Sequence, residues 1–194
     1  MSTTSATGGY LSPANTPSPL QGQALLDFFQ AWFVGITGLP GTNVRPRWQP
    51  EPGNIPPVSA DWIAFGIPHR QSDVFTAEVH NSSGLGYNET RRHEVLNFLI
   101  SIYGPNADAT AETLREGMQV VQNQEVLNLA NMGLIESGDL VTSPELVKDK
   151  WYYRVDFTIK VRRQIVLQFA IENIASVNAA SNVNNEHYVT NINV

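Results

Sequence analysis

Hydrophobic positions follow two different periods along the chain, and the change between them predicts the elements. From residue 20 to 37 apolar residues recur at spacings of three and four, as in an amphipathic helix: Ala24, Leu25, Phe28, Trp32, Phe33 and Ile36. Ser18-Pro19-Leu20-Gln21 reads as an N-cap with a capping box, and Gly38-Leu39-Pro40-Gly41 ends the helix. This stripe fits core packing, and the alternative is that part of it seals a contact between subunits.

Alternating apolar and polar residues predict strands at 61–67, 91–103, 151–161 and 165–171. Both faces of the 91–103 strand carry apolar residues, so both are expected to be at least partly covered. The 151–161 strand has one apolar face, expected to be buried: Trp151, Tyr153, Val155, Phe157, Ile159 and Val161. Its other face carries Tyr152, Arg154, Asp156, Thr158 and Lys160.

Between these strands the pattern predicts two further helices and two irregular segments. A helix capped by Asn106 or Asp108 has the stripe Ala107, Ala111, Leu114, Met118 and Val121, and a second helical piece covers 125–131 before a short strand around Leu134 and Ile135. Residues 44–57 contain five prolines, which predicts an extended, rigid surface segment. Residues 68–88 are polar and predict a long loop or a protruding hairpin.

The order of elements predicts an α+β fold with one mostly antiparallel β-sheet packed against α-helices. The chain of 194 residues is long enough for one domain with a sizeable core, placed at 18–172. Residues 1–17 are rich in Ser, Thr, Gly and Pro, and predict a disordered or extended N-terminal arm. Residues 173–194 are rich in Asn, Ser and Ala, and predict a flexible C-terminal tail.

Composition narrows the classes of function. A net charge of -6 argues against a protein whose main task is to hold nucleic-acid phosphates. The absence of cysteine excludes disulfides and thiolate metal sites. No apolar run is long enough for a membrane helix, and the first residues lack the basic and apolar regions of a signal peptide, so we expect a soluble protein made in a cytoplasm.

A search for catalytic motifs yields no candidates. The sequence has no G-x-S-x-G elbow and no phosphate-binding glycine loop, and its histidines, His69, His80, His93 and His187, lack the spacing of a zinc site. His80 and His93 are therefore interpreted as ordinary surface or strand histidines. The sequence predicts no catalytic residue, no metal and no cofactor.

The residues predicted to make contacts with other proteins or subunits are surface charges and one tryptophan. Arg45, Arg47 and Trp48 lie in the proline-rich segment, where an arginine-flanked tryptophan is typical of a docking anchor. Along the 151–161 strand and the basic pair after it, alternating charges either face water or pair with a neighbouring subunit to fix its register. These candidates are Arg154, Asp156, Lys160, Arg162 and Arg163.

Four segments together resemble the neck and tail terminator family of long-tailed bacteriophages and prophages, over about residues 20–172. They are GLPGTNVRPRWQPEP, DWIAFGI, RRHEVLNFLISIYGPNA and WYYRVDFTIKVRRQI. The resemblance implies a structural virion protein of the tail and neck, made in the host bacterial cytoplasm. It implies a homo-oligomer, a hexameric ring on the last ring of the tail tube. Its partners would be tail-tube and sheath proteins and the head-neck connector, with DNA passing through the lumen without specific binding.

Two other classes of function stay open. Another ring-forming protein of the same particle, such as a head-completion or tail-tube subunit, shares nearly every feature of composition. An isolated binding module or an enzyme with a novel site is the second alternative. Images of the purified protein distinguish them, because rings favour assembly and monomers favour the module.

Overall fold

The computed structural model describes residues 3–14, 20–51, 53–147 and 149–174, and the backbone of 176–183 and 186–193. Contacts divide the chain into two compact units, with boundaries inside two long strands. The first, here called the helical unit, comprises Ser18–Phe75 and Arg92–Ile165. The second, here called the terminal unit, comprises Met1–Pro17, Thr76–Arg91 and Val166–Val194. The predicted division into an arm, a domain at 18–172 and a tail stays a prediction.

The main sheet has the strand order β1-β2-β4-β9-β5, with β3 added beside β4 and β6 beside β9. Its strands are β1 (Val44–Pro46), β2 (Trp62–Ser72), β3 (Ala77–Asn81), β4 (Tyr87–Tyr103), β5 (Met132–Ser137), β6 (Val141–Thr142) and β9 (Arg154–Phe169). β2 and β3 run antiparallel to β4, and β5 and β6 run antiparallel to β9, whereas β1 runs parallel to β2 at one edge. Two hairpins form separate sheets, β7 (Glu145–Val147) with β8 (Lys150–Tyr152), and β10 (Ser176–Val183) with β11 (Glu186–Asn193). The predicted α+β fold is confirmed.

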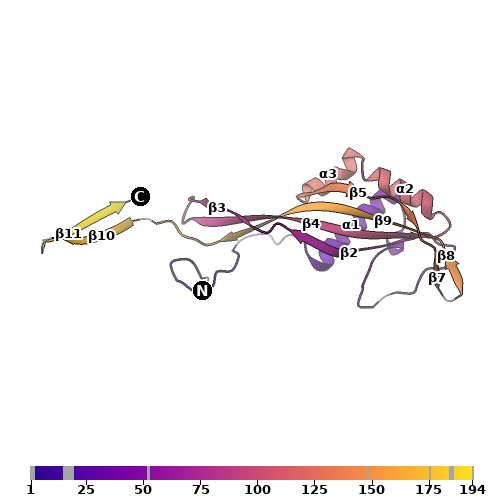
Figure 1. Ribbon diagram of the computed structural model, residues 1–194, viewed down its shortest axis with the longest axis horizontal. Helices are drawn as coiled ribbons and strands as arrows, with labels where there is room; N and C mark the ends of the chain where they lie inside the picture. The colour runs from indigo at the N-terminus through magenta and orange to yellow at the C-terminus, as the bar shows by residue number, and fades with distance from the viewer. Residues whose placement is uncertain are drawn as a thin grey trace. The chain divides into compact units, whose positions relative to one another are not determined.

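Three α-helices lie beside the sheet of the helical unit: α1 (Gly22–Thr37), α2 (Ala107–Gly117) and α3 (Val121–Leu129) (Figure 1). A short 3-10 helix, η1 (Gly41–Asn43), leads from α1 into β1. One continuous core joins the helices to a single face of the sheet, because alternate residues of β2, β4 and β9 point toward them. Its members include Phe29, Phe33, Phe65, Phe98, Leu96, Ile100, Ile102, Leu114, Phe157 and Ile159.

The first helix ends where the sequence predicts, and Leu25, Trp32 and Phe33 of its predicted stripe are buried, but two positions of the stripe differ. Gly38 adopts a left-handed φ of 70° and stops α1, whereas the predicted cap residues Ser18 and Pro19 lie outside the described residues. Phe29, rather than Phe28, lies at the centre of the core, and Ala24 is exposed. Trp32 and Phe33 are buried within the subunit, so the stripe supplies core packing and leaves no surplus of aromatic residues for an interface.

Two predicted strands are in fact one. The prediction of separate strands at 151–161 and 165–171 is wrong, because β9 runs without interruption from Arg154 to Phe169 through the basic pair. Its apolar face begins at Val155, while Trp151 belongs to the β7–β8 hairpin and is exposed. An exposed hairpin shows the same alternation of apolar and polar residues as a buried strand, so the periodicity alone does not separate β8 from β9.

Other predicted elements differ from the structure mainly at their ends. Of the two forms predicted for the 68–88 segment, a long loop or a protruding hairpin, the structure shows the hairpin: β2 continues to Ser72, and β3 pairs with the first residues of β4. The second predicted helix, 125–131, begins earlier, at Val121. Val121 is exposed although the stripe placed it inside, because α2 ends at Gly117 and the new helix restarts with another phase. The strand around Leu134 and Ile135 is confirmed as β5.

Candidate functional site

The sheet face opposite the helices carries most of the candidate residues. Ile63 and Phe65 face the helices, so Trp62, Ala64 and Gly66 of β2 point the other way, as do their register partners in β4. The same alternation places part of β9 on this face: Arg154, Asp156, Thr158, Lys160 and Arg162. We call it the open face.

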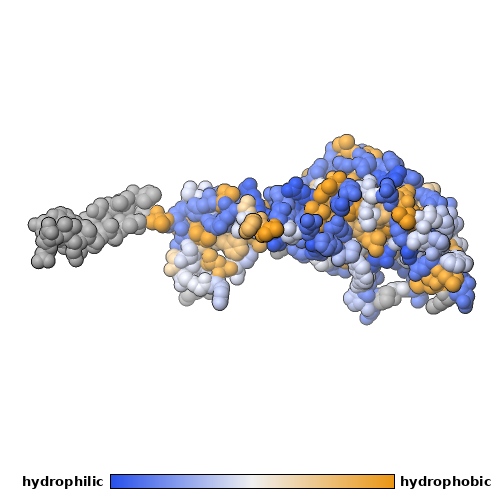
Figure 2. Space-filling view, viewed as in Figure 1, coloured by the Kyte–Doolittle hydropathy of each residue, from blue (hydrophilic) through white to orange (hydrophobic). Residues whose placement is uncertain are grey.

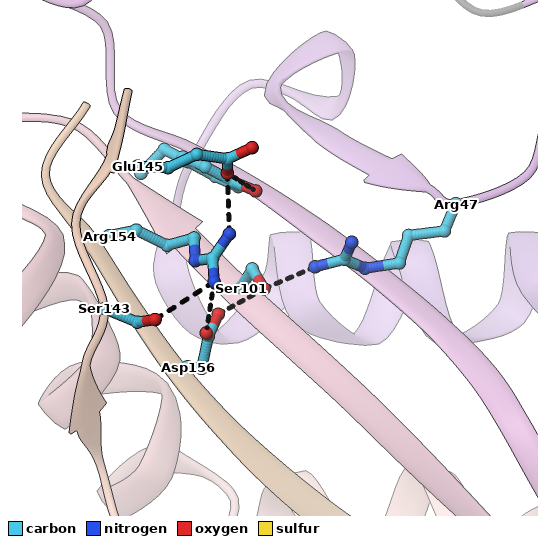
Figure 3. A network of polar contacts seen from close by, with 7 residues as sticks. Arg47, Ser101, Ser143, Glu145, Arg154 and Asp156 are labelled. Carbon is cyan, nitrogen blue, oxygen red and sulfur yellow. Dashed lines mark hydrogen bonds and ion pairs between the residues drawn. The ribbon is translucent and has the colours of Figure 1, made fainter. Parts of the chain in front are cut away.

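A polar network crosses the open face from β1 to β9 (Figure 3). The Arg47 guanidinium donates from Nη2 to the Ser101 hydroxyl, which in turn donates to Oδ1 of Asp156. Ser101 is almost completely buried, on the central strand β4. The hydroxyl thus links a cation that follows β1 to a carboxylate on β9, and it satisfies hydrogen-bonding groups that would be costly to bury alone.

Arg154 forms the other half of the network (Figure 3). Its Nη1 lies 2.6 Å from Oε2 of Glu145, and its Nη2 lies 3.0 Å from Oδ2 of Asp156 and 3.1 Å from Oγ of Ser143. Partial burial lowers the pKa of Arg154, but the negative charge of Asp156 and hydrogen bonds raise it, and the net direction is upward. The group therefore stays charged. Arg154 and Asp156, predicted to face water or pair with a neighbouring subunit, already pair within one subunit.

Arg163 does not share the open face. It has the parity of Val155 and Val161, so it points toward the core, where only 4% of it is exposed. Its Nε donates to Oε2 of the equally buried Glu94 at 2.7 Å, and its Nη1 donates to the carbonyl oxygen of Leu20 at 2.6 Å. The expectation that Arg163 belongs with the surface charges of the strand is wrong. The alternation of buried and exposed positions along β9 indicates its burial, because Arg163 has the parity of the buried residues.

Lys160 and Arg162 remain on the surface of β9. Lys160 Nζ lies 2.7 Å from Oε2 of Glu136 on the neighbouring strand β5, with both side chains about half exposed. Arg162 is exposed, and within the described residues its side chain has no polar partner. Of the charged candidates on β9, Arg162 is thus the one with its donors available.

Trp48 is exposed to 69% and has a backbone φ of 59°, which is uncommon for a bulky residue. Its ring lies against β2 at Gly66, where an added Cβ would come within 2.5 Å of the indole. Glycine at this position lets the ring lie against the sheet. Arg45 next to it donates from Nε to the carbonyl of Thr42 at 2.7 Å and from Nη1 to the carbonyl of Asn54 at 2.8 Å. These bonds connect Arg45 to η1 and to a later residue of the proline-rich segment.

Sequence reasoning missed the β7–β8 hairpin and its anchors. Leu146 and Trp151 are exposed and lie directly opposite each other in the hairpin, while Glu145 and Tyr152 form the next pair. The only hint of the hairpin in the sequence is Glu145, a carboxylate that lies nine residues before Arg154 and could pair with it. This hint is weak, because the number of residues between two side chains does not determine whether they meet across a turn of unknown register.

In the terminal unit, His80 lies in a cluster of amide groups. Its Nδ1 is 2.6 Å from Oδ1 of Asn88 and its Nε2 is 2.8 Å from Oδ1 of Asn173. Hydrogen bonds first to Asn88 and then to Asn173 raise the pKa of His80, because two acceptors favour the form in which both ring nitrogens carry protons. Asn173 also donates from Nδ2 to the carbonyl of Ser82 at 2.9 Å, so it closes the turn between β3 and β4.

In the helical unit, His93 has a different partner. Its Nδ1 lies 3.4 Å from Oδ2 of Asp73. Within the described residues no group of three or more histidine, aspartate or glutamate side chains is arranged to hold a metal ion. The described part of the chain also has no helix with the length and hydropathy needed to cross a bilayer.

Comparison with known proteins gives one finding. The model of a protein family described as "phage neck terminator protein" matches residues 23–187, which is most of the chain. A search of curated proteins found no match. The matched range includes the whole helical core, the open face and the β7–β8 hairpin.

Proposed function

The chain belongs to the phage neck terminator protein family, and on that premise we propose that it forms a hexameric ring that caps the tail tube and joins it to the head-neck connector. The family gives the chain a tail terminator role and a place in the neck of the virion. The observation that carries the proposal is the family match across residues 23–187.

The architecture supports a role in stacking and closing rings. Helices cover one face of the sheet, whereas the open face has a fixed polar network with exposed residues around it, so surface remains for neighbours. We propose tail-tube and possibly sheath proteins below the ring and the connector above it as those neighbours. A net charge of -6 on every subunit suits a lumen through which genomic DNA slides without specific binding.

We propose that the protein catalyses no reaction and needs no cofactor. A terminator of this family is a structural subunit, and its work is selective contact rather than bond breaking. The candidate residues accordingly divide into two roles. Trp48 and Arg162 are available for contacts between subunits, and Lys160 is half exposed in its pair with Glu136. Arg45, Arg47, Arg154 and Asp156 hold local structure. Arg163 is no longer proposed as an interface residue, because it is buried in its own subunit.

The experiment is to disrupt the gene in the phage that encodes it and to examine the lysate by electron microscopy. We expect filled heads and tails that are not joined, with tails of abnormal length, and recovery of complete virions when the intact gene is supplied from a plasmid. Normal joined virions without the protein would contradict the proposal.

Mixing of extracts separates this role from a head-completion role. We expect the mutant lysate to supply heads that become infectious with tails from a donor lacking heads, and to supply no usable tails. The reverse result, usable tails and defective heads, would favour a head-completion protein instead.

A further inference from the structure

In the terminal unit one histidine joins two asparagine side chains, and we call His80, Asn88 and Asn173 together the amide clasp. His80 on β3 lies directly opposite Asn88 on β4, and Asn173 follows the end of β9. Oδ1 of Asn88 lies 2.6 Å from Nδ1 of His80, and Oδ1 of Asn173 lies 2.8 Å from its Nε2. A single imidazole therefore connects the β3–β4 hairpin to the chain that leaves β9.

The orientation of both amides is fixed by their nitrogen atoms. Nδ2 of Asn88 donates to Oε1 of Glu78. Nδ2 of Asn173 donates to the carbonyl oxygens of Ser82 at 2.9 Å and Gly84 at 3.3 Å. A carboxylate and a backbone carbonyl only accept hydrogen bonds, so neither amide can turn over without bringing its oxygen against another acceptor. Both amide oxygens are thus held toward the imidazole.

Two amide oxygens around one imidazole require a proton on each of its nitrogens. An amide oxygen cannot donate, so both nitrogens of His80 must donate in this arrangement. The neutral imidazole has one N–H, and in either tautomer a nitrogen lone pair would face an amide oxygen at 2.6 or 2.8 Å. Turning an amide over would only move the conflict to Glu78 or to the carbonyls of the turn. The geometry therefore belongs to the positively charged form.

No other charge has to be invoked for the protonation of His80. The other titratable side chains in the described part of the terminal unit are Glu78 on the same face of β3, Tyr87, Glu89 and Arg91 on the opposite face of β4, Glu172 beside Asn173, and Tyr10. Hydrogen bonds first to Asn88 and then to Asn173 raise the pKa of His80, whereas burial lowers it. His80 is exposed, and Figure 2 shows hydrophilic surface around β3, so the imidazole exchanges protons with the solvent.

The amide clasp lies just before the C-terminal hairpin of β10 and β11. The backbone N–H of Asn173 donates to the carbonyl oxygen of Leu85 at 2.8 Å. Gly86, with a φ of 91°, leaves room for the asparagine, because an added Cβ would come within 2.5 Å of its Oδ1. The hairpin begins three residues later, at Ser176, and its strands pair with each other in a sheet of their own. Contacts of Asn173 with the β3–β4 turn therefore anchor the chain where it enters the hairpin.

We propose that His80 is a pH-dependent switch for this anchor: the doubly protonated imidazole holds Asn173 on the β3–β4 turn, and loss of one proton loosens that hold. The neutral imidazole keeps only one of its two hydrogen bonds, so the contacts of the β3–β4 turn alone hold the chain. Because the pKa of His80 is raised, the hold is complete below the ordinary value of 6.5 and is lost as pH rises through the higher folded value. The inference does not rest on the proposed ring.

The test is amide hydrogen exchange of the full-length subunit, followed by NMR across the titration of His80. After correction for the intrinsic effect of pH on exchange, protection of the Asn173 backbone N–H should fall by roughly three-fold or more as His80 loses its proton. In His80→Gln, whose side chain does not titrate, this protection should not depend on pH. The matched control His93→Gln removes the histidine that lies beside Asp73 in the helical unit, and it should keep the pH dependence of the parent.

A second measurement reads the same coupling from the histidine. Asn173→Ala removes one of the two acceptors, so the pKa of His80 should fall toward 6.5 in an NMR titration, and thermal unfolding confirms that the variant is folded. Protection at Asn173 that is independent of pH in the parent, or a pH dependence that survives in His80→Gln, would overturn the proposal. A pKa that Asn173→Ala leaves unchanged would also overturn it, because the imidazole would then not hold this residue.

Discussion

The buried pair of Arg163 and Glu94 allows a sharp test of the internal role assigned to this arginine. In the variant Arg163→Met, a side chain of similar length loses its charge and its donors. The Glu94 carboxylate then stays buried without its partner, and the carbonyl of Leu20, just before α1, loses a donor.

The expected loss follows from burial. Side-chain exposure is 4% for Arg163 and 8% for Glu94, so water does not compensate the remaining charge. Removing one partner of a buried ion pair costs about 3–5 kcal/mol of the free energy of unfolding. Replacing both partners, with Arg163→Met and Glu94→Leu, should recover most of that loss, because two apolar side chains leave no isolated charge. For a chain of this length the single variant should lower the melting temperature by roughly 10 °C.

The assay is urea unfolding of the dilute subunit, followed by circular dichroism. The matched control is Lys160→Met, which breaks the half-exposed pair with Glu136 on the same strand and should cost less than about 1 kcal/mol. If Arg163→Met costs no more than Lys160→Met, the buried pair does not stabilise the fold as argued. Loss of particle assembly with unchanged stability would return Arg163 to the interface.

Two further predictions concern single contacts. Gly66→Ala places a Cβ where the Trp48 ring lies, so the ring should move into water while the free energy of unfolding changes by less than about 1 kcal/mol. We expect iodide to quench the fluorescence of Trp48 more strongly in this variant, and unchanged quenching would contradict the packing of the ring on Gly66. Hydrogen bonds to Asn88 and Asn173 raise the pKa of His80 in the folded protein. The stabilisation that protonated His80 contributes is therefore complete below the ordinary pKa near 6.5, and it is lost as pH rises through the higher pKa of the folded state. NMR titration of His80 measures the direction of the pKa shift, and a lowered pKa would contradict the prediction.

The fold class was predictable because the long elements have strong periods. The core strand β4 and the buried positions of β9 follow directly from alternation, and the end of α1 follows from Gly38. The choice of Phe29 over Phe28 as the more deeply buried residue of α1 was not predictable, because the two are adjacent and both pack against the core. The β7–β8 hairpin was missed because its break at Tyr153 leaves the alternation of apolar residues intact.

The candidate surface was predictable in composition but not in pairing. Trp48 is exposed, as an anchor must be, and Arg162 has its donors available. The sequence did not indicate that Ser101, a small residue inside an apolar strand, connects Arg47 to Asp156. Such networks depend on which strands are neighbours, and strand order follows from tertiary packing rather than from local pattern.

The central claim is tested most directly by cryo-electron microscopy of the complete virion at the junction of tail and head. The account predicts that the fold of the helical unit fits density directly above the last ring of the tail tube, in six copies around the axis. Density for this fold at another site, such as the far end of the tail, or its absence from the virion would contradict the account.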